Sequence, residues 1–317
     1  MNAMPRLSVL VPVHNDREYV DKCLEQLTRQ KYRNVEFVVR DDASTDDTPD
    51  KVRQWAQRDS RIRFERNATN IKRVAQYRKL LHEDSRGDYI MVHDGNDHVQ
   101  DEDYLERMMR PIDEAPGIRM AVGSMTLRIP GAPTIQINQP VLRRMKVDTY
   151  KTLTREEILD IIPSTPIWSL HGCTITEKKL LLEAETFVDD RFPEATALPF
   201  LAPGDRIALV NAKGLVWDMR PGVSDTDLLG GRCGFGLEVC RHIMGRAKKA
   251  RPGITPLELA TLFCGSWSTL TFRELWTVCR DEIGLGPLLK NARRMYRIRL
   301  YCMARRRMAL GRPEVWM

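Results

Sequence analysis

The sequence predicts an α/β fold built on a mostly parallel sheet, and two features of its first 110 residues lead to this prediction. Short β-branched runs alternate with segments in which apolar residues recur at helical spacing. Polar residues follow the ends of four of these runs. Strands and helices that alternate at this pitch require right-handed crossovers, which leave successive strands parallel.

The first elements follow from apolar spacing and from start signals. Residues 7–13 form a short β-branched run, which predicts a buried strand, and residues 35–40 predict a second one. A helix is expected over residues 17–30, and another begins at Thr48-Pro49, where a capping hydroxyl precedes a proline at the first helical position. The apolar stripe of the first helix consists of Tyr19, Val20, Cys23, Leu24 and Leu27.

The later part of the chain is less regular. Thr154 and Glu157 match a capping box ahead of an apolar segment, so a helix should begin there. Further strands are expected at 62–64, 89–92, 168–175, 206–210 and 215–217, and further helices at 72–82, 237–250, 256–269 and 287–309.

Composition limits the classes of protein. We find no secretory signal and no stretch of eighteen apolar residues, and the seven scattered cysteines show no CxxC pair, so we expect a cytoplasmic protein without disulfides or a zinc site. The net charge of +7 comes largely from arginines near the C-terminus. These could face solvent, an anionic lipid surface, an acidic glycan or nucleic acid. Nucleic acid is disfavoured, because the basic segment lacks interleaved aromatic residues and any recognised module.

Polar residues follow four successive predicted strands. They are His14-Asn15-Asp16, Asp41-Asp42, residues 67–70 and residues 93–97. In parallel sheets, ligands bind beyond the carboxyl ends of the strands. Repetition over four strands therefore predicts a binding site at that edge.

Two acidic clusters at this edge suggest a chemistry. Asp94, Asn96 and Asp97 offer oxygen ligands of the kind that Mg²⁺ or Mn²⁺ takes beside phosphate groups. Asp42 could accept hydrogen bonds from a nucleoside. Each cluster has a structural alternative: the first as a turn that caps the helix after Asp101, the second as ordinary turn and cap interactions.

Taken together and in order, these segments resemble the inverting family 2 glycosyltransferases of GT-A fold. The resemblance rests on LSVLVPVHN at 7–15, NVEFVVRDDASTDDT at 34–48 and GDYIMVHD at 87–94. It is strong over residues 7–110 and looser over 165–226. It implies a GT-A domain over 1–228, with a nucleotide-sugar half up to about residue 110 and an acceptor half over 111–228, followed by a basic helical region over 229–317.

The resemblance also implies roles for particular residues. A divalent metal, Mn²⁺ or Mg²⁺, would be held by Asp94, Asn96 and Asp97. The donor nucleotide would lie against Pro12, Val13, His14, Asn15, Asp42, Asn70, Arg73, Arg78, Asp94 and Gly95.

Three departures from the family pattern stand out. Asn96 replaces an aspartate of the usual Asp-x-Asp-Asp sequence, and the segment after Asn70 lacks the expected glycine, so that Lys72, Arg73 or Arg78 could contact phosphate. The family's Glu-Asp pair, which supplies the catalytic base, is replaced by Glu194-Ala195.

A carboxylate must take the proton of the attacking acceptor hydroxyl in inverting transfer. Glu194 stands at the matching point, Asp189 and Asp190 remain as alternatives, and Glu194 could instead cap a helix. His171 falls where the family lines its acceptor pocket, and Arg220 where a basic segment can close over the diphosphate. A structural histidine and a surface loop are the alternatives for these two residues.

The sequence therefore predicts transfer of a sugar from a nucleotide-sugar donor, UDP-sugar by default, to a glycan or lipid-linked acceptor in surface polysaccharide synthesis. A catalytically impaired relative that binds nucleotide sugar or a partner is the alternative. Residues 287–309 could contact a membrane peripherally at its inner face, or pack on the main domain or on a second subunit of a homo-oligomer.

Overall fold

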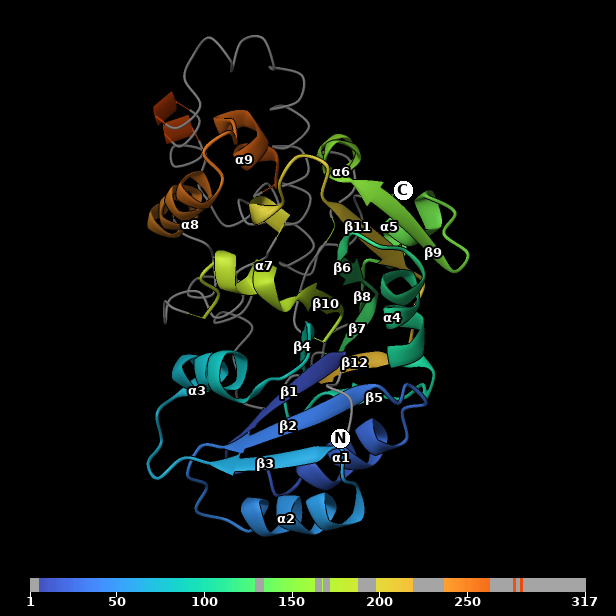
Figure 1. Ribbon diagram of the computed structural model, residues 1–317, viewed down its shortest axis with the longest axis vertical. Helices are drawn as coiled ribbons and strands as arrows, with labels where there is room; N and C mark the ends of the chain where they lie inside the picture. The colour runs from blue at the N-terminus through green and yellow to red at the C-terminus, as the bar shows by residue number, and fades with distance from the viewer. Residues whose placement is uncertain are drawn as a thin grey trace.

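The computed structural model describes residues 6–128, 134–162, 167, 172–187, 198–218, 237–262, 276–277 and 280–281 (Figure 1). The strands are β1 (Leu7–Val13), β2 (Val35–Asp41), β3 (Ile62–Arg66), β4 (Tyr89–Val92), β5 (His98–Val99), β6 (Ile118–Val122), β7 (Met125–Arg128), β8 (Ile135–Ile137), β9 (Tyr150–Thr154), β10 (Thr174–Glu177), β11 (Arg206–Val210) and β12 (Leu215–Asp218).

Helices flank these strands throughout the described part of the chain. The α-helices are α1 (Val20–Thr28), α2 (Thr48–Arg58), α3 (Arg73–Lys79), α4 (Tyr104–Glu114), α5 (Gln139–Arg144), α6 (Arg155–Ile161), α7 (Lys178–Glu183), α8 (Leu237–Ala250) and α9 (Pro256–Leu262). A π-helical turn η1 (Leu80–Asp84) continues α3, and a 3₁₀ turn η2 (Leu198–Phe200) precedes β11.

The main sheet has eight strands in the order β3-β2-β1-β4-β10-β6-β11-β9. All of them except β10 and β9 run in one direction. The predicted α/β class with a mostly parallel sheet is therefore confirmed. A second sheet of four strands, in the order β5-β12-β7-β8, was not expected from the sequence.

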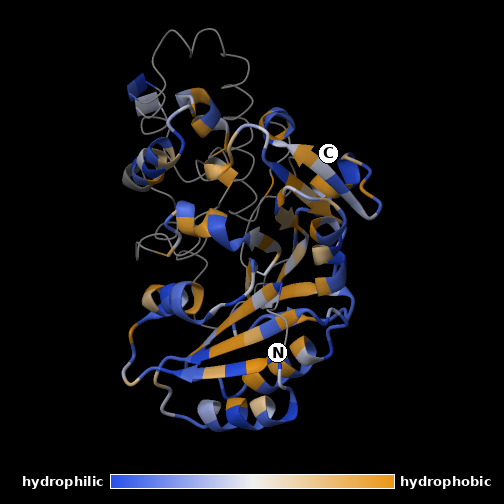
Figure 2. Ribbon diagram, viewed as in Figure 1, coloured by the Kyte–Doolittle hydropathy of each residue, from blue (hydrophilic) through white to orange (hydrophobic). Residues whose placement is uncertain are grey.

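Both faces of the main sheet are covered, which explains the continuous apolar runs of its first strands. Val9 and Val11 of β1 point into a core shared with α1, α2 and α4, whereas Leu10 points into the core beneath α3 and α6 to α9. Apolar residues line the strands in Figure 2, and polar residues mark the outer sides of the helices. Because α8 and α9 contribute to the second core, they pack on the same body as the sheet.

Gly87, just before β4, lets that strand approach β1 closely. A Cβ atom on Gly87 would lie 2.7 Å from the backbone nitrogen of Ser8 and 2.8 Å from the carbonyl carbon of Leu7. The Gly87 N–H donates to Ser8 Oγ at 2.8 Å, and Ser8 Oγ donates to Glu36 Oε1 at 2.6 Å. The spacing of β1 and β4 therefore depends on the missing side chain.

Helix starts agree with the sequence in one case and differ in another. The capping box is present, with Glu157 N donating to Thr154 Oγ1 at 3.3 Å and Thr154 N donating to Glu157 Oε2 at 2.8 Å. Thr48, in contrast, does not cap α2, whose first flanking residue is Asp47. The buried Thr48 hydroxyl accepts from the backbone N–H of Asp16 at 2.8 Å, so it serves the loop after β1 instead.

Arg119 of β6 forms a cluster of ion pairs at the amino ends of β6 and β11. Its guanidinium lies 2.5 Å from Glu177, 3.3 Å from Glu183 and 3.0 Å from Asp205. Burial opposes the charge, but the hydrogen bonds to Glu177 and Asp205 outweigh burial and raise the pKa of Arg119 above its usual value. The cluster joins β6, β10, α7 and the loop before β11.

Several expectations for the second half need correction or lie outside the described residues. Within the described part, the strand expected at 168–175 begins only at Thr174, because Gly172 turns the chain with φ +72°. α9 ends at Leu262, and residues 263–269 and 287–309 lie outside the described residues. Among the helices described, none is long and apolar enough to cross a membrane.

Candidate functional site

The carboxyl ends of β1, β2 and β4 meet at one edge of the sheet. Asp42, after β2, donates its N–H to Val13 O at 2.9 Å. Gly95, after β4, approaches the same residue, since a Cβ on Gly95 would lie 2.8 Å from Val13 Cγ1 and 3.4 Å from Pro12 O. The loops that carry Asp42 and Asp94 therefore both lie against the end of β1. We call this region, with its loops 12–16, 41–48, 67–72 and 93–97, the acidic edge.

The Asp42 carboxylate is buried, with 2% of the residue exposed, and three hydrogen bonds hold it. Its Oδ1 accepts from Asn67 Nδ2 at 2.9 Å and from Ile71 N at 2.8 Å, and its Oδ2 accepts from Lys72 N at 2.9 Å. An ionised carboxylate has about four acceptor positions. Asp42 thus keeps about one position, on Oδ2, for a further donor.

The loop after β1 is locked to the loop after β2. Asn15 takes a left-handed backbone conformation (φ 53°), which asparagine tolerates better than most residues. Its N–H donates to Ser44 Oγ at 2.8 Å, and its Oδ1 accepts from Thr45 N at 2.9 Å. The Ser44 hydroxyl in turn donates to the Asp41 carboxylate. The contacts of Asn15, Ser44 and Thr45 therefore join two loops of the acidic edge, in addition to any local turn that these residues form.

His14 has a defined tautomer in this arrangement. Its Nδ1 lies 2.8 Å from the carbonyl oxygen of Asp42, which can only accept, so Nδ1 carries the hydrogen. Its Nε2 is then an acceptor, and the side-chain amides of Asn70 and Asn15 approach it at 3.2 Å and 3.4 Å. Three residues of the predicted donor site, His14, Asn15 and Asn70, therefore lie together at the acidic edge.

Lys72 occupies an unusual backbone conformation. Its φ of 73° and ψ of 161° fall in a region that is almost restricted to glycine. The sequence resemblance leads us to expect a glycine in this segment, and Lys72 adopts a backbone conformation that favours glycine. The Lys72 N–H bonds to Asp42 and also to Asn70 Oδ1 at 3.0 Å, and its side chain is exposed.

The two predicted arginines near α3 differ in their surroundings. Arg73, the first residue of α3, is exposed. Arg78 Nε donates to the carbonyl of Phe187, 3.1 Å away, so that nitrogen is directed to the chain after α7. Of these two residues, Arg73 is the one beside Lys72.

Asp94 is oriented by a residue that the sequence did not single out. The Tyr77 hydroxyl donates to Asp94 Oδ1 at 2.6 Å, and the backbone N–H of Asp97 donates to Asp94 O at 2.9 Å and forms a tight turn. Asp94 and Asn96 are half-buried and Asp97 is buried. Next to them, burial lowers the pKa of His93 to about 4, although the Asp94 carboxylate opposes this shift.

The Asp94–Asp97 turn has the chemistry of a hard-cation site but not a complete protein cage. Within the described ranges, no group of three His, Cys, Asp or Glu side chains is placed to hold a metal. Mg²⁺ is commonly held by one or two carboxylates, with phosphate oxygens and water as its other ligands. Asp94, the Asn96 carbonyl and Asp97 fit that kind of site.

The other predicted site residues lie outside the described residues: Asp189, Asp190, Glu194, His171 and Arg220. The described residues that adjoin them in sequence lie close to the acidic edge. The ring of Phe187 packs 4.9 Å from that of Tyr77, and Asp189, Asp190 and Glu194 follow Phe187 in sequence. Gly172, after His171, donates its N–H to Val92 O at 2.6 Å. Val216 pairs with His98 in antiparallel register, so β12 runs back toward Asp97 before Arg220.

Three residues to which the sequence assigned no particular role support the site. Arg40 and Tyr77 were not singled out, and Asn67 was included only among the polar residues 67–70 that follow β3. Arg40 carried a readable signal, since it is a positively charged residue within a strand that is buried along its whole length, where an unpaired charge would be costly. Tyr77 carried none, because its position on the helical stripe is equally that of a core residue.

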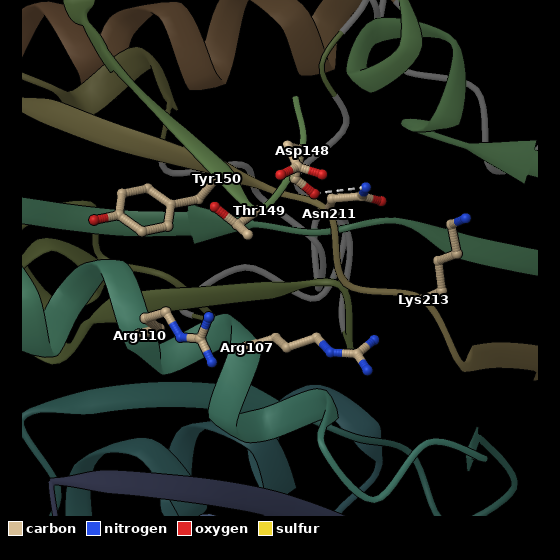
Figure 3. Close-up of a pocket in the computed structure, with 7 residues that line it drawn as sticks. All are labelled: Arg107, Arg110, Asp148, Thr149, Tyr150, Asn211 and Lys213. Carbon is tan, nitrogen blue, oxygen red and sulfur yellow. Dashed lines mark hydrogen bonds between the residues drawn. The ribbon is translucent and has the colours of Figure 1, made fainter. Parts of the chain in front are cut away.

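A separate cavity of about 280 Å³ lies between α4 and the paired strands β9 and β11 (Figure 3). It contains no residue of the acidic edge. Arg107 is already paired with Asp101 at 2.8 Å and with Asp103 at 3.5 Å, and Asp148 faces the cavity together with Arg110 and Lys213. The lining residues are Arg107, Arg110, Asp148, Thr149, Tyr150, Asn211 and Lys213.

Comparison with known proteins gives a family match over the part of the chain that contains the acidic edge. Residues 8–164 match the family described as glycosyl transferase family 2. This segment belongs to that family. It contains the whole acidic edge and the two acidic loops on which the sequence resemblance rested.

Curated relatives match over the same part of the chain. Glycosyltransferase GlyG of Streptococcus pneumoniae is 30% identical over 108 residues, which is 34% of this chain and 35% of that protein. Putative glycosyltransferase EpsH of Bacillus subtilis is 32% identical over 106 residues, 33% of this chain and 30% of that protein. The chain thus matches only about a third of the length of these relatives.

Solved structures resemble the chain over nearly its full length. S. aureus TarS 1-349, in complex with UDP-GlcNAc, has a TM-score of 0.60 at 20% identity and covers 96% of this chain and 92% of that chain. The mannosyltransferase PcManGT from Pyrobaculum calidifontis, in complex with GDP-Man and Mn²⁺, has a TM-score of 0.52 at 15% identity, with 99% and 88% covered. These likenesses show the GT-A glycosyltransferase fold.

Proposed function

We propose that the protein is an inverting glycosyltransferase that moves a sugar from a UDP-sugar to a hydroxyl of a glycan or lipid-linked acceptor. The observation that supports this most directly is the meeting of the Asp42 and Asp94 loops against Val13 at the end of β1. The polar side chains of the proposed donor site therefore lie beside the Asp94–Asp97 turn, which offers oxygen ligands suited to a hard cation. Membership of residues 8–164 in the family supports the reaction class.

The hydrogen bonding of Asp42 favours UDP over GDP as the carrier. Guanine presents neighbouring N1–H and N2–H donors, which would need both carboxylate oxygens, whereas the uracil edge presents a single N3–H. Asp42 has about one acceptor position left, because Asn67, Ile71 and Lys72 use the others. The TarS structure contains UDP-GlcNAc, whereas the mannosyltransferase contains GDP-Man, so the two likenesses do not decide between the bases.

A divalent cation completes the proposed donor site. Asp94, Asn96 and Asp97 would hold Mn²⁺ or Mg²⁺, which would neutralise the departing diphosphate. Tyr77 holds one oxygen of Asp94 by its hydrogen bond at 2.6 Å and so orients the carboxylate. The Lys72 and Arg73 side chains are both exposed, and the Lys72 N–H bonds to Asp42, so these side chains would supply further positive charge for phosphate oxygens.

The acceptor side of the reaction rests on residues outside the described part. Glu194, with Asp189 and Asp190 as alternatives, would take the acceptor proton, His171 would line the acceptor site, and Arg220 would close over the diphosphate. Packing of Phe187 on Tyr77 supports this arrangement, because the chain that leads to the three acids starts one side chain away from Asp94.

Acceptor and cellular place belong to the same proposal. A glucosyltransferase of Campylobacter jejuni, named for an undecaprenol-linked acceptor, is 36% identical over 61 residues, which favours a lipid-linked glycan. We propose that residues 1–228 form the catalytic domain and that the basic region 229–317 contacts an anionic membrane surface or a second subunit on the cytoplasmic side.

A nucleotide-sugar panel tests the proposal. Thermal shift and hydrolysis would be measured for UDP-, GDP- and dTDP-sugars, with and without Mn²⁺. We expect stabilisation by a UDP-sugar that requires Mn²⁺ and release of UDP on incubation. Asp42→Ala should weaken binding of UDP about 10-fold or more, as expected when a buried charged acceptor is lost. Binding of UDP-sugar without any turnover, with acceptor or water, would instead identify a nucleotide-sugar-binding relative.

A further inference from the structure

A buried arginine connects the interior of the molecule to Asp42. Arg40, the sixth residue of β2, is 6% exposed, and its guanidinium forms a two-pronged pair with Asp84, Nε and Nη2 each lying 2.7 Å from a carboxylate oxygen. Its Nη1 donates to Asn67 Oδ1 at 2.7 Å. Asn67 Nδ2 then donates to Asp42 Oδ1 at 2.9 Å. Four buried side chains therefore form one continuous chain of hydrogen bonds.

The chemistry of the donors fixes the orientation of each group. A guanidinium only donates and a carboxylate only accepts. The Asn67 amide must therefore turn its oxygen to Arg40 and its nitrogen to Asp42. If Arg40 were lost, the amide could flip and place its oxygen against the carboxylate. The pair with Asp84 prevents this by holding the guanidinium in a planar, two-bond geometry.

The orientation of Asp42 carries over to the loop that follows β3. The same carboxylate accepts the backbone N–H groups of Ile71 and Lys72, and so holds the chain in the glycine-like conformation of Lys72. It also leaves about one acceptor position, whose direction depends on the other three hydrogen bonds. A small rotation of the carboxylate would displace both that position and Lys72.

We propose that Arg40 and Asn67 are positioning residues for the donor site: they act through Asp42, contact no substrate, and set the affinity for the nucleotide diphosphate. The predicted effect of these residues on UDP binding rests on the proposed function. Their predicted effect on residues 71–72 rests on the geometry alone. A purely structural network would instead change stability without a selective effect on nucleotide binding.

The first experiment measures UDP binding by calorimetry in the presence of Mn²⁺. Asn67→Ala removes two hydrogen bonds with charged groups, the one to the Asp42 carboxylate and the one from Arg40, and should raise the Kd for UDP about 10-fold. Arg40→Lys keeps a positive charge beside Asp84 but cannot bond both to Asp84 twice and to Asn67, and it should raise the Kd by a similar factor. Once an acceptor is known, donor KM should rise about as much while kcat changes less than about twofold.

A matched control separates positioning from stability. Arg155 of α6 is also buried, with a carboxylate partner in Glu258 at 3.0 Å, but it lies in a different part of the fold. Arg155→Met should lower the melting temperature and leave the Kd for UDP within about twofold of wild type. An equal rise in Kd in this control and in Asn67→Ala would overturn the proposal, since loss of stability alone would then explain both.

Hydrogen exchange gives a readout that needs no nucleotide. The backbone amides of Ile71 and Lys72 should exchange at least about 10-fold faster in Asn67→Ala and Arg40→Lys than in wild type. In Arg155→Met their exchange rates should equal those of wild type. If wild type binds no nucleotide, the proposed function fails. Hydrogen exchange then still tests whether Arg40 and Asn67 position residues 71–72. If protection of the two amides is the same in all four proteins, the positioning role is wrong.

Discussion

The two halves of the main sheet each contain one arginine with several acidic or amide partners, and the two arginines serve different ends of their strands. Arg40 lies near the carboxyl end of β2 and reaches Asp42 through Asn67. Arg119 lies near the amino end of β6 and reaches Glu177, Glu183 and Asp205. The first group ends at a candidate binding residue, and the second joins four elements without contact to the acidic edge.

The difference shows that burial and ion pairing alone do not identify a functional group. Both arginines have their pKa raised by their partners: Arg40 first by hydrogen bonds to Asp84, Arg119 by the hydrogen bonds that outweigh its burial. Their contacts beyond the ion pair distinguish them. Substitutions at the acidic edge should therefore change binding, whereas substitutions in the second half should change either stability or the proton transfer step.

The largest effect is expected for the proposed base. Glu194→Gln should lower kcat by a factor of about 10²–10⁴, the range typical of a lost general base, and should leave the Kd for UDP unchanged. Single-turnover transfer with UDP-sugar and acceptor checks the rate, and calorimetry checks the binding. Asp189→Asn and Asp190→Asn serve as matched controls. If one of these controls loses turnover and Glu194→Gln does not, the base belongs to the alternative residue.

The Arg119 cluster should affect stability alone. Arg119→Met removes the cation beside Glu177 and Asp205, whereas Glu183 keeps its pair with Arg251 at 2.8 Å. Because Arg119 is partly exposed, we expect a loss of about 3 kcal/mol in the free energy of unfolding. Urea unfolding measures the loss, and UDP binding at a temperature where the variant is folded should equal that of wild type. A weaker affinity for UDP in this variant would remove the contrast with Arg40.

His93 should make stability depend on pH. Its folded-state pKa is about 4 because of burial, below the value of about 6.5 in the unfolded chain. Between these values the unfolded chain binds the proton and the folded chain does not, so stability falls as the pH falls from about 6.5 to 4, by up to ~3 kcal/mol. His93→Leu should lack this part of the pH dependence in urea titrations at pH 7 and pH 4.5. An unchanged slope would contradict the assignment.

Lys72 should give the smallest effect and refine the role of its loop. Lys72→Gly relieves the backbone strain, and after the entropy of a glycine in the unfolded chain is subtracted we expect a gain of about 1 kcal/mol in stability. Lys72→Ala keeps the strain and removes the charge. Both variants should bind UDP about threefold more weakly, as for loss of an exposed ionic contact. Unequal affinities would show that the backbone shape, rather than the charge, matters for the nucleotide.

The sequence predicted most closely the bounds of strands that are buried on both faces. The apolar runs at 7–13, 89–92 and 206–210 match β1, β4 and β11 in their bounds. The same reasoning missed β6, and also β7 to β9, which are short or half-exposed. It placed α4 only as a helix after Asp101 and not its bounds, and the interior of this helix contains Pro111. Pairing with distant strands decides such elements, and no local pattern records that pairing.

The candidate site was predictable at its acidic groups but not in its connections. Polar residues after each strand placed Asp42 and Asp94 at one edge, because parallel strands end together. The hydroxyl of Tyr77 and the amide of Asn67 reach these carboxylates from segments whose local sequence is compatible with ordinary core and turn roles. The hydroxyl of Thr48 was assigned to its own helix, whereas the fold brings the Asp16 amide to it.

The missing side chain at Gly87 has a consequence for genetics. A methyl group there would collide with the backbone at Leu7 and Ser8 and push the start of β4 away from β1. The displacement would be carried along the rigid strand to the opposite end, where Asp94 faces the end of its neighbour. An alanine allele at position 87 would therefore behave in an assay like a defect of the sugar-nucleotide pocket, although the altered residue lies a full strand length from it.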